Sequence, residues 1–231
     1  RDVVNLTIFN ETSSEPSSYR KRINSLFGSA SLGGRHMLYL DATLRGDQSS
    51  TLPTGNNVYV YPSFSGSFVF SELLHAGNKM PYGKLRMSWA QVGSDTDPYQ
   101  LGLVYTKSKY TYPGYTIGYI NNSTIPNKDL KPTKTNSFEM GLETKFLNNR
   151  LGLDITYYAQ KSKNQIMGMA TSWTSGYTYR LINAGEIDNK GIEITLNTRP
   201  IQTRDFSWDL NLNFSKNSNK VVRLVDGMDM F

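Results

Sequence analysis

Carboxylates that stand inside short, strand-like stretches are the first residues in this sequence that could do chemistry. Glu139, Asp154 and Glu193 each have apolar neighbours on both sides, and Glu143 has one at Leu142. Two carboxylates that face each other can share general acid and base roles, as in glycoside hydrolysis. No helper constellation accompanies these four, and charges on a wet surface usually pair with Lys or Arg. We therefore expect no catalytic residue and no enzymatic activity.

Metal and adhesion motifs are equally weak. His36 and His75 are the only histidines and lie in separate predicted turns, and the chain has no cysteine, so we predict no metal site and no cofactor. The aspartates of "SDTDP" (94–98) could bind a hard cation or form a turn ahead of Pro98. Arg45-Gly46-Asp47 spells an adhesion tripeptide, but we interpret it as the exit of a strand into a loop.

Tyrosines are concentrated in residues 94–134, which hold six of the fifteen in the chain. Tyrosine combines a large contact area with a polar hydroxyl and a small entropy loss, and is therefore favoured at recognition surfaces. The candidates for contact with a ligand or a partner protein are Tyr105, Tyr110, Tyr112, Tyr115 and Tyr119, with Trp173, Tyr177 and Tyr179 in a second stretch. The alternative is that these rings pack the loops against themselves.

Composition excludes several classes of protein. The chain has 231 residues, of which 38% are apolar, and a mean hydropathy of −0.48. No window approaches 18 uninterrupted apolar residues, which excludes a membrane-spanning helix. The net charge of +6 is scattered, so we expect no nucleic-acid binding. The first residues, "RDVVNLTIFN", do not resemble a signal peptide.

Strict alternation of apolar and polar residues predicts the elements that position these side chains. In residues 191–196, Ile192, Ile194 and Leu196 alternate with Glu193 and Thr195, which is the period of a β-strand with two different faces. The same pattern occurs in eight stretches of about ten residues. They are residues 24–33, 36–45, 61–70, 84–93, 137–146, 150–160, 182–196 and 206–215.

Nine charged residues of these stretches fall opposite the apolar face: Asp41, Arg45, Arg86, Glu139, Glu143, Lys145, Asp154, Glu193 and Asp209. In a soluble sheet this polar face would meet water, whereas in an outer-membrane barrel it would line the wet lumen. The residues that we expect to face the lumen are Asp41, Arg45, Glu139, Glu143, Asp154, Glu193 and Asp209.

The connections between strands favour the barrel. Those around 33–35, 147–149 and 200–205 are short and 71–83 is intermediate, while long polar stretches cover about 46–60, 94–134 and 162–185. Short and long connections alternate, as in transmembrane barrels with tight turns at one rim and long surface loops at the other. We predict an all-β fold, an antiparallel transmembrane β-barrel segment of about eight strands. The alternative is a soluble β-domain.

Several segments resemble barrel hairpins of the SusC/RagA family, the TonB-dependent outer-membrane transporters of Bacteroidota. They include "SLFGSASLGGRHMLYLDATLRGDQSS", "YPSFSGSFVFSELL" and "KLRMSWAQVG". The more specific blocks are "NKDLKPTKTNSFEMGLETKFLNNRLGLDITYYAQKSKNQI" and "NAGEIDNKGIEITL". The resemblance covers barrel alone. No stretch resembles a plug domain, a TonB box or a terminal strand, so residues 1–231 are expected to be part of a larger, plugged barrel.

The resemblance also implies a function and a location in the bacterial outer membrane. Such transporters import an oligosaccharide or peptide together with a SusD-like surface lipoprotein that acts as a lid. They are energised by the TonB complex through parts absent from this sequence, and their barrels contact outer-membrane lipid. The alternatives are a passive porin-like channel and a soluble or surface-attached β-domain that binds glycans. The residues do not indicate which nutrient is carried.

Overall fold

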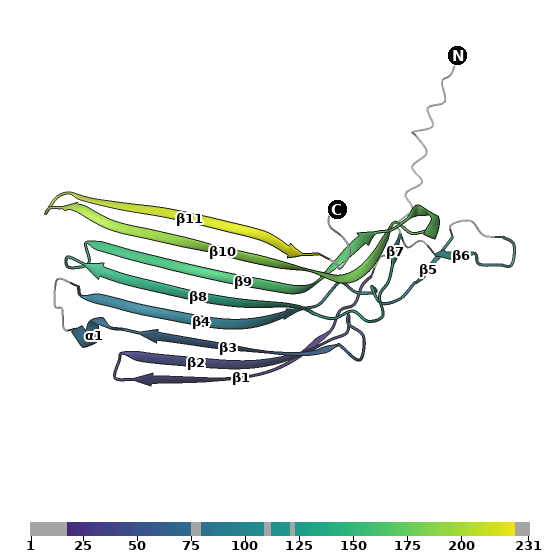
Figure 1. Ribbon diagram of the computed structural model, residues 1–231, viewed down its shortest axis with the longest axis horizontal. Coiled ribbons are helices and arrows are strands. Elements are labelled where there is room, and N and C mark those ends of the chain that lie inside the picture. Colours follow the sequence, from purple (N-terminus) through teal and green to yellow (C-terminus); the bar gives the residue numbers. More distant parts are fainter. Residues whose placement is uncertain (1–17, 75–79, 109–111, 121–122, 225–231) are drawn as a thin grey trace, which may run out of the picture.

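The computed structural model describes residues 18–74, 80–108, 112–120 and 123–224. They form one antiparallel sheet in the order β1-β2-β3-β4-β8-β9-β10-β11, and short β7 (Thr124–Ile125) pairs with β10 in parallel. Figure 1 shows these strands side by side in an open, twisted sheet. The long strands are β1 (Ile23–Gly34), β2 (Leu38–Ser49), β3 (Val58–Phe68), β4 (Tyr82–Ser94), β8 (Thr133–Phe146), β9 (Leu151–Ala170), β10 (Tyr179–Gln202) and β11 (Ser207–Arg223).

Three small elements lie outside this sheet path. α1 (Ser71–Leu74) is a single turn between β3 and β4, and η3 (Trp173–Ser175) is a 3-10 turn between β9 and β10. β5 (Tyr105–Lys107) and β6 (Gly118–Ile120) form a separate two-stranded hairpin. Among the described residues, no helix is long and apolar enough to cross a membrane.

Strand register aligns the two predicted faces across the whole sheet. Ile194 lies opposite Ile155 on one side and Phe214 on the other, whereas its neighbour Glu193 lies opposite Thr156 and Ser215. Since side chains alternate between the faces of a strand, one face is continuously apolar and the other polar. The all-β prediction and its eight long strands are confirmed.

The placement of the connections at two opposite ends is confirmed, but their lengths do not alternate strictly, since residues 69–81 between β3 and β4 outnumber residues 50–57 between β2 and β3. In Figure 1 the turns β1–β2, β8–β9 and β10–β11, together with α1, lie at one end of the sheet. The β2–β3, β4–β8 and β9–β10 connections lie at the opposite end, which we call the loop rim. Neighbouring strands in sequence also neighbour each other in space, so the connections must alternate between the two ends.

Two of the predicted long loops are wrong in extent. Strands β9 and β10 continue into residues 162–185 and leave only 171–178 between them, and β2 and β3 leave only 50–57 of the predicted 46–60. β11 likewise extends to Arg223 instead of ending near residue 215. In these extensions apolar residues stand in adjacent pairs, such as Ile166-Met167, Leu181-Ile182 and Val221-Val222, so the apolar alternation that identifies the rest of each strand is missing. Only the 94–134 connection is long, and it spans residues 95–132.

The apolar face is uncovered. Leu40, Met87 and Phe214 remain 46%, 46% and 57% exposed. Within the described residues the buried hydrophobic side chains are Leu52, Tyr59, Leu130, Leu181 and Ala184. A soluble domain rarely leaves an apolar surface of this size open to water. The face therefore fits contact with lipid and disfavours the soluble alternative.

Candidate functional site

The polar face of the sheet carries all seven residues that were predicted to face the lumen. Asp41 and Arg45 lie on this face of β2, and Glu139 and Glu143 lie on it in β8. The strand register places Asp154 on β9, Glu193 on β10 and Asp209 on β11 on the same face. A polar hollow of ≈ 270 Å³ opens on this face. Its polar lining includes Asp41, Ser65, Lys84, Arg86, Ser88 and Glu139.

Arg86 joins three strands on the polar face. From β4 its guanidinium reaches across β8 and donates two hydrogen bonds to the Asp154 carboxylate on β9, with Nη1 at 3.0 Å from Oδ2 and Nη2 at 2.8 Å from Oδ1. Nη2 also donates to Thr156 Oγ1 at 2.6 Å. A two-pronged Arg–carboxylate pair fixes geometry as well as charge, so this contact ties β4 to β9 without a shared ladder.

Gly141 makes this crossing possible. It lies opposite Arg86 on one side and Thr156 on the other. A Cβ at residue 141 would meet Arg86 Nε at 2.3 Å and Cζ at 2.7 Å, closer than side-chain atoms can approach. Glycine is therefore required for close passage of the arginine, not for a special backbone angle.

The other carboxylates of this face differ in their partners. Asp209 pairs with Arg199 (Nε to Oδ1 2.6 Å), and Asp41 accepts a hydrogen bond from Ser65 Oγ at 3.3 Å. Among the described residues, Glu139, Glu143 and Glu193 make no ion pair. Glu143 nevertheless lies directly opposite Lys84 in the register of β4 and β8, so positive charge stands close to it.

Hydrogen bonds within β2 and to the neighbouring strands β1 and β3 hold the side chains of the Arg45-Gly46-Asp47 tripeptide. Arg45 Nε donates to Asp47 Oδ1 at 2.9 Å and its Nη2 donates to Ser25 Oγ at 3.1 Å. Tyr61 donates its hydroxyl hydrogen to the second Asp47 oxygen. Asp47 is 5% exposed, which argues against display of the tripeptide for adhesion.

A small hydrophobic core lies at the loop rim, where two connections meet the ends of two strands. Leu52 from the β2–β3 connection and Leu130 from the β4–β8 connection pack with Tyr59 on β3 and Leu181 on β10, and Leu130 is fully buried. These residues belong to none of the alternating stretches, so the alternation does not point to them. The signal available was an apolar residue within otherwise polar stretches, as in "KDLKPT".

Asp95 links the same connections through hydrogen bonds. Its Oδ1 accepts from Lys21 Nζ at 2.6 Å, and its Oδ2 accepts from Ser49 Oγ at 2.5 Å and Thr51 Oγ1 at 3.2 Å. Burial opposes ionisation of the carboxyl, but these contacts outweigh it and hold the pKa of Asp95 below its ordinary value. The "SDTDP" segment thus uses its first aspartate as a hydrogen-bonding hub.

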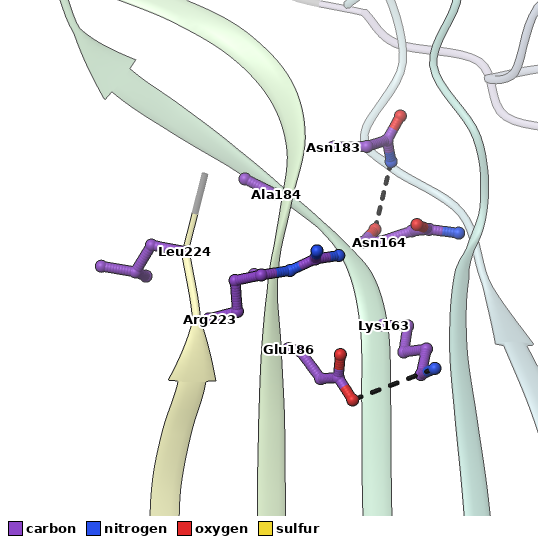
Figure 2. Close-up of a pocket in the computed structure, with 8 residues that line it drawn as sticks. Lys163, Asn164, Asn183, Ala184, Glu186, Arg223 and Leu224 are labelled. Atoms are coloured by element: carbon purple, nitrogen blue, oxygen red, sulfur yellow. Dashed lines mark hydrogen bonds and ion pairs between the residues drawn. The ribbon is translucent and has the colours of Figure 1, made fainter. Parts of the chain in front are cut away.

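Asn183 joins the two most family-like blocks of the sequence. Its side-chain oxygen accepts from the Lys131 backbone N–H, and its amide nitrogen donates to the Lys131 carbonyl, both at 2.7 Å. The same nitrogen donates to the Asn164 carbonyl at 3.1 Å (Figure 2). "NKDLKPT" and "NAGEIDNKGIE" are therefore held against each other at the loop rim.

A cavity of ≈ 210 Å³ lies next to this junction, where β10 and β11 shift register (Figure 2). Gly185, with φ at +85°, produces the irregularity. Glu186 points toward Lys163, and its Oε1 lies 3.9 Å from the Lys163 Nζ. The same carboxylate pairs with Lys161.

The aromatic candidates at the loop rim are mostly exposed. Tyr105, Tyr112, Tyr115 and Tyr119 are exposed by 78%, 65%, 72% and 47%; we call these four the loop tyrosines. Figure 1 shows the β5–β6 hairpin that carries Tyr105 and Tyr119 projecting beyond the end of the main sheet. In the second stretch Trp173 and Tyr179 are exposed by 81% and 45%, and Tyr177 is partly buried. Tyr110 lies outside the described residues.

Metal binding finds no support in the described part of the chain, where no group of three or more His, Cys, Asp or Glu residues could hold an ion. His36 lies in the β1–β2 turn, and His75 falls outside the described residues.

Comparison with known proteins identifies the family. A model of the family "TonB dependent receptor-like, beta-barrel" matches residues 2–226. TonB-dependent receptor P3 of Formosa agariphila is 30% identical over 223 residues, which are 94% of this chain and 22% of that protein. TonB-dependent receptor SusC of Bacteroides thetaiotaomicron is 28% identical over 218 residues, 91% of this chain and 22% of SusC.

Solved structures agree with the sequence matches. The RagAB peptide transporter aligns with a TM-score of 0.83 and 25% identity over 90% of this chain and 23% of that chain. The ferric enterobactin receptor PfeA shares the fold, with a TM-score of 0.58, 21% identity and coverage of 88% of this chain and 28% of that chain. This chain spans about a fifth of the length of the curated relatives P3 and SusC. It belongs to the TonB-dependent receptor-like β-barrel family, as a SusC/RagA-like segment of an outer-membrane β-barrel.

Proposed function

We propose that this chain forms part of the wall of a TonB-dependent transporter that imports an oligosaccharide or a peptide together with a SusD-like surface lipoprotein. The observation that carries the proposal is the two-faced sheet, which superposes on the RagAB peptide transporter over 90% of its length. The relative named SusC supports it from the sequence. The protein acts by binding and passage, not by chemical conversion.

In this role the apolar face contacts lipid and the polar face lines the interior. Arg86 and Asp154 then fix the spacing of β4, β8 and β9 along the wall. The carboxylates Glu139, Glu143 and Glu193, which form no close ion pair among the described residues, meet a plug or the passing nutrient. Such a surface remains hydrated, because ionised carboxylates keep their water unless they are paired.

The loop tyrosines have the second role in the proposal. They project from the rim at which a surface lipoprotein or an incoming nutrient would arrive. Large, exposed aromatic side chains outside the sheet suit recognition better than wall building. In this proposal the TonB complex, a separate partner, supplies the energy for transport through a plug domain of the full-length protein.

The test is uptake by cells that express the full-length protein. Labelled oligosaccharides and labelled peptides are offered separately, in cells with and without TonB and with and without the neighbouring lipoprotein. The proposal requires that uptake of one class disappears without TonB. Uptake that continues unchanged without TonB would instead identify a passive, porin-like channel.

A further inference from the structure

On the apolar side of the sheet, three lysines lie just beyond the alternating apolar residues of β10 and β11, on the side nearer the loop rim. On β10 the outward positions run Leu196, Ile194, Ile192 and then Lys190. On β11 the outward positions pass from Phe214 to Lys216, Ser218 and Lys220, which the register keeps on the same face. The three side chains are exposed. We call Lys190, Lys216 and Lys220 the lysine patch.

The lysine patch is compact. Lys190 lies opposite Ser218, so that Lys216 and Lys220 are its two diagonal neighbours on β11. Diagonal neighbours on one face of an antiparallel pair are about 7–8 Å apart, within reach of long side chains. Three like charges at this spacing repel one another unless an anion lies between them. Asp188 lies opposite Lys220, and one aspartate leaves the patch positively charged.

Neighbouring lysines on the same face show the contrast. Lys161 and Lys163 share the Glu186 carboxylate, and Figure 2 shows the contact with Lys163. No residue that the structure describes forms an ion pair or a hydrogen bond with a side chain of the lysine patch. The patch therefore has its charge available for a partner outside this chain.

The position of the patch indicates the chemistry of that partner. An outward surface immediately beyond the apolar band lies at the level of lipid headgroups. Phosphates at that level are anionic, and each Lys or Arg near such a surface adds to membrane affinity. We propose that the lysine patch binds phosphate groups of lipid headgroups in the outer leaflet. The proposal depends on the orientation of the barrel in the membrane and not on which nutrient is imported.

Native mass spectrometry of the full-length protein in detergent tests this site, with diphosphorylated lipid A as the probe. The double variant Lys190→Gln/Lys216→Gln removes two charges of the patch. We expect its affinity for lipid A to fall on the order of tenfold or more, as follows from the usual contribution of a lysine at an anionic surface. Lys190→Arg/Lys216→Arg should retain binding and shows that the positions tolerate substitution.

A matched control removes two charges from the opposite face. Lys84→Gln/Lys145→Gln should bind lipid A as the unaltered protein does, because both lysines lie on the polar face. Inorganic phosphate added at the concentration of lipid A should not displace it, which separates a lipid headgroup from a free-phosphate site. Equal lipid A binding by all variants, or equal loss in the control, would overturn the proposal, as would efficient displacement by phosphate.

Discussion

Replacing Gly141 with alanine should separate Arg86 from Asp154. The new Cβ would stand 2.3 Å from Arg86 Nε and 2.8 Å from its Cγ. These atoms lie in the middle of the side chain, while the guanidinium is held by Asp154 and Thr156. Arg86 therefore has to give up these hydrogen bonds to relieve the contact.

The loss can be bounded from the exposure of the pair. Hydrogen bonds to charged groups contribute about 1.5–3 kcal/mol when buried, and fully exposed pairs contribute about 0.2–1 kcal/mol. The side chains of Arg86 and Asp154 are each 32% exposed, which places this pair between the two limits. We expect loss of the pair to cost about 1–2 kcal/mol, allowing for partial screening by solvent. The strand's preference for alanine over glycine offsets about 0.5–1 kcal/mol of this, so Gly141→Ala should lower the free energy of unfolding by about 1 kcal/mol.

A double-mutant cycle supplies the assay and the refutation. Unfolding of the full-length barrel in detergent is followed by its heat-dependent gel mobility and by urea titration, in backgrounds with and without Arg86→Ala. Without the arginine, Gly141→Ala should be neutral or stabilising, since alanine is favoured over glycine within a strand by about 0.5–1 kcal/mol. An equal destabilisation in both backgrounds would show that Gly141 serves the backbone and not the arginine.

Ile194→Arg places a charge on the lipid-facing side and should destabilise the barrel by about 2–4 kcal/mol, with Thr195→Arg much milder; equal losses in urea titrations would contradict the assignment of faces. Asp95 has a lowered folded-state pKa, so its contribution is present above the unfolded pKa and disappears as pH falls through the folded value. Amide hydrogen exchange of residues 50–57 should accelerate as Asp95 becomes protonated, and Asp95→Asn should remove this pH dependence. The same pH dependence of exchange in Asp95→Asn would show that Asp95 does not hold these residues in place. Replacing the loop tyrosines with serine should weaken nutrient uptake or lipoprotein pull-down while leaving barrel insertion intact, and normal uptake and binding would leave them as packing residues.

Within the fold, the alternating strands were predictable because lipid and water impose opposite demands on successive residues. Ile192 to Leu196 is an example, since both the strand and its two faces follow from five residues. The upper half of β9, from residue 161 on, was not predictable by this criterion. Residues 161–165 are polar on both faces, and the apolar Ile166 and Met167 that follow are adjacent, so no period of two marks this part of the strand.

At the candidate site, residue types were predictable and partnerships were not. The shared face of Glu139, Asp154 and Glu193 follows from period two alone. The contact between Arg86 and Asp154 depends on the register of β4, β8 and β9, since the two are 68 residues apart in sequence. A local pattern cannot specify such a pairing, nor the meeting of Asn183 with Lys131.

The hydrophobic core makes one part of the loop rim more rigid than another. Leu52 and Leu130 tie the β2–β3 and β4–β8 connections to each other and to Leu181 on β10, so the backbone entropy of these segments is already lost in the folded protein. A ligand that bound to this part would meet a preorganised surface, and little further ordering of the chain would be needed. The β5–β6 hairpin is a separate two-stranded sheet, and isolated hairpins are marginally stable. Binding to this hairpin would order a flexible segment and cost conformational entropy. The same rim therefore offers a rigid surface, where little entropy is lost on binding, and a flexible one that can adapt its shape to different partners.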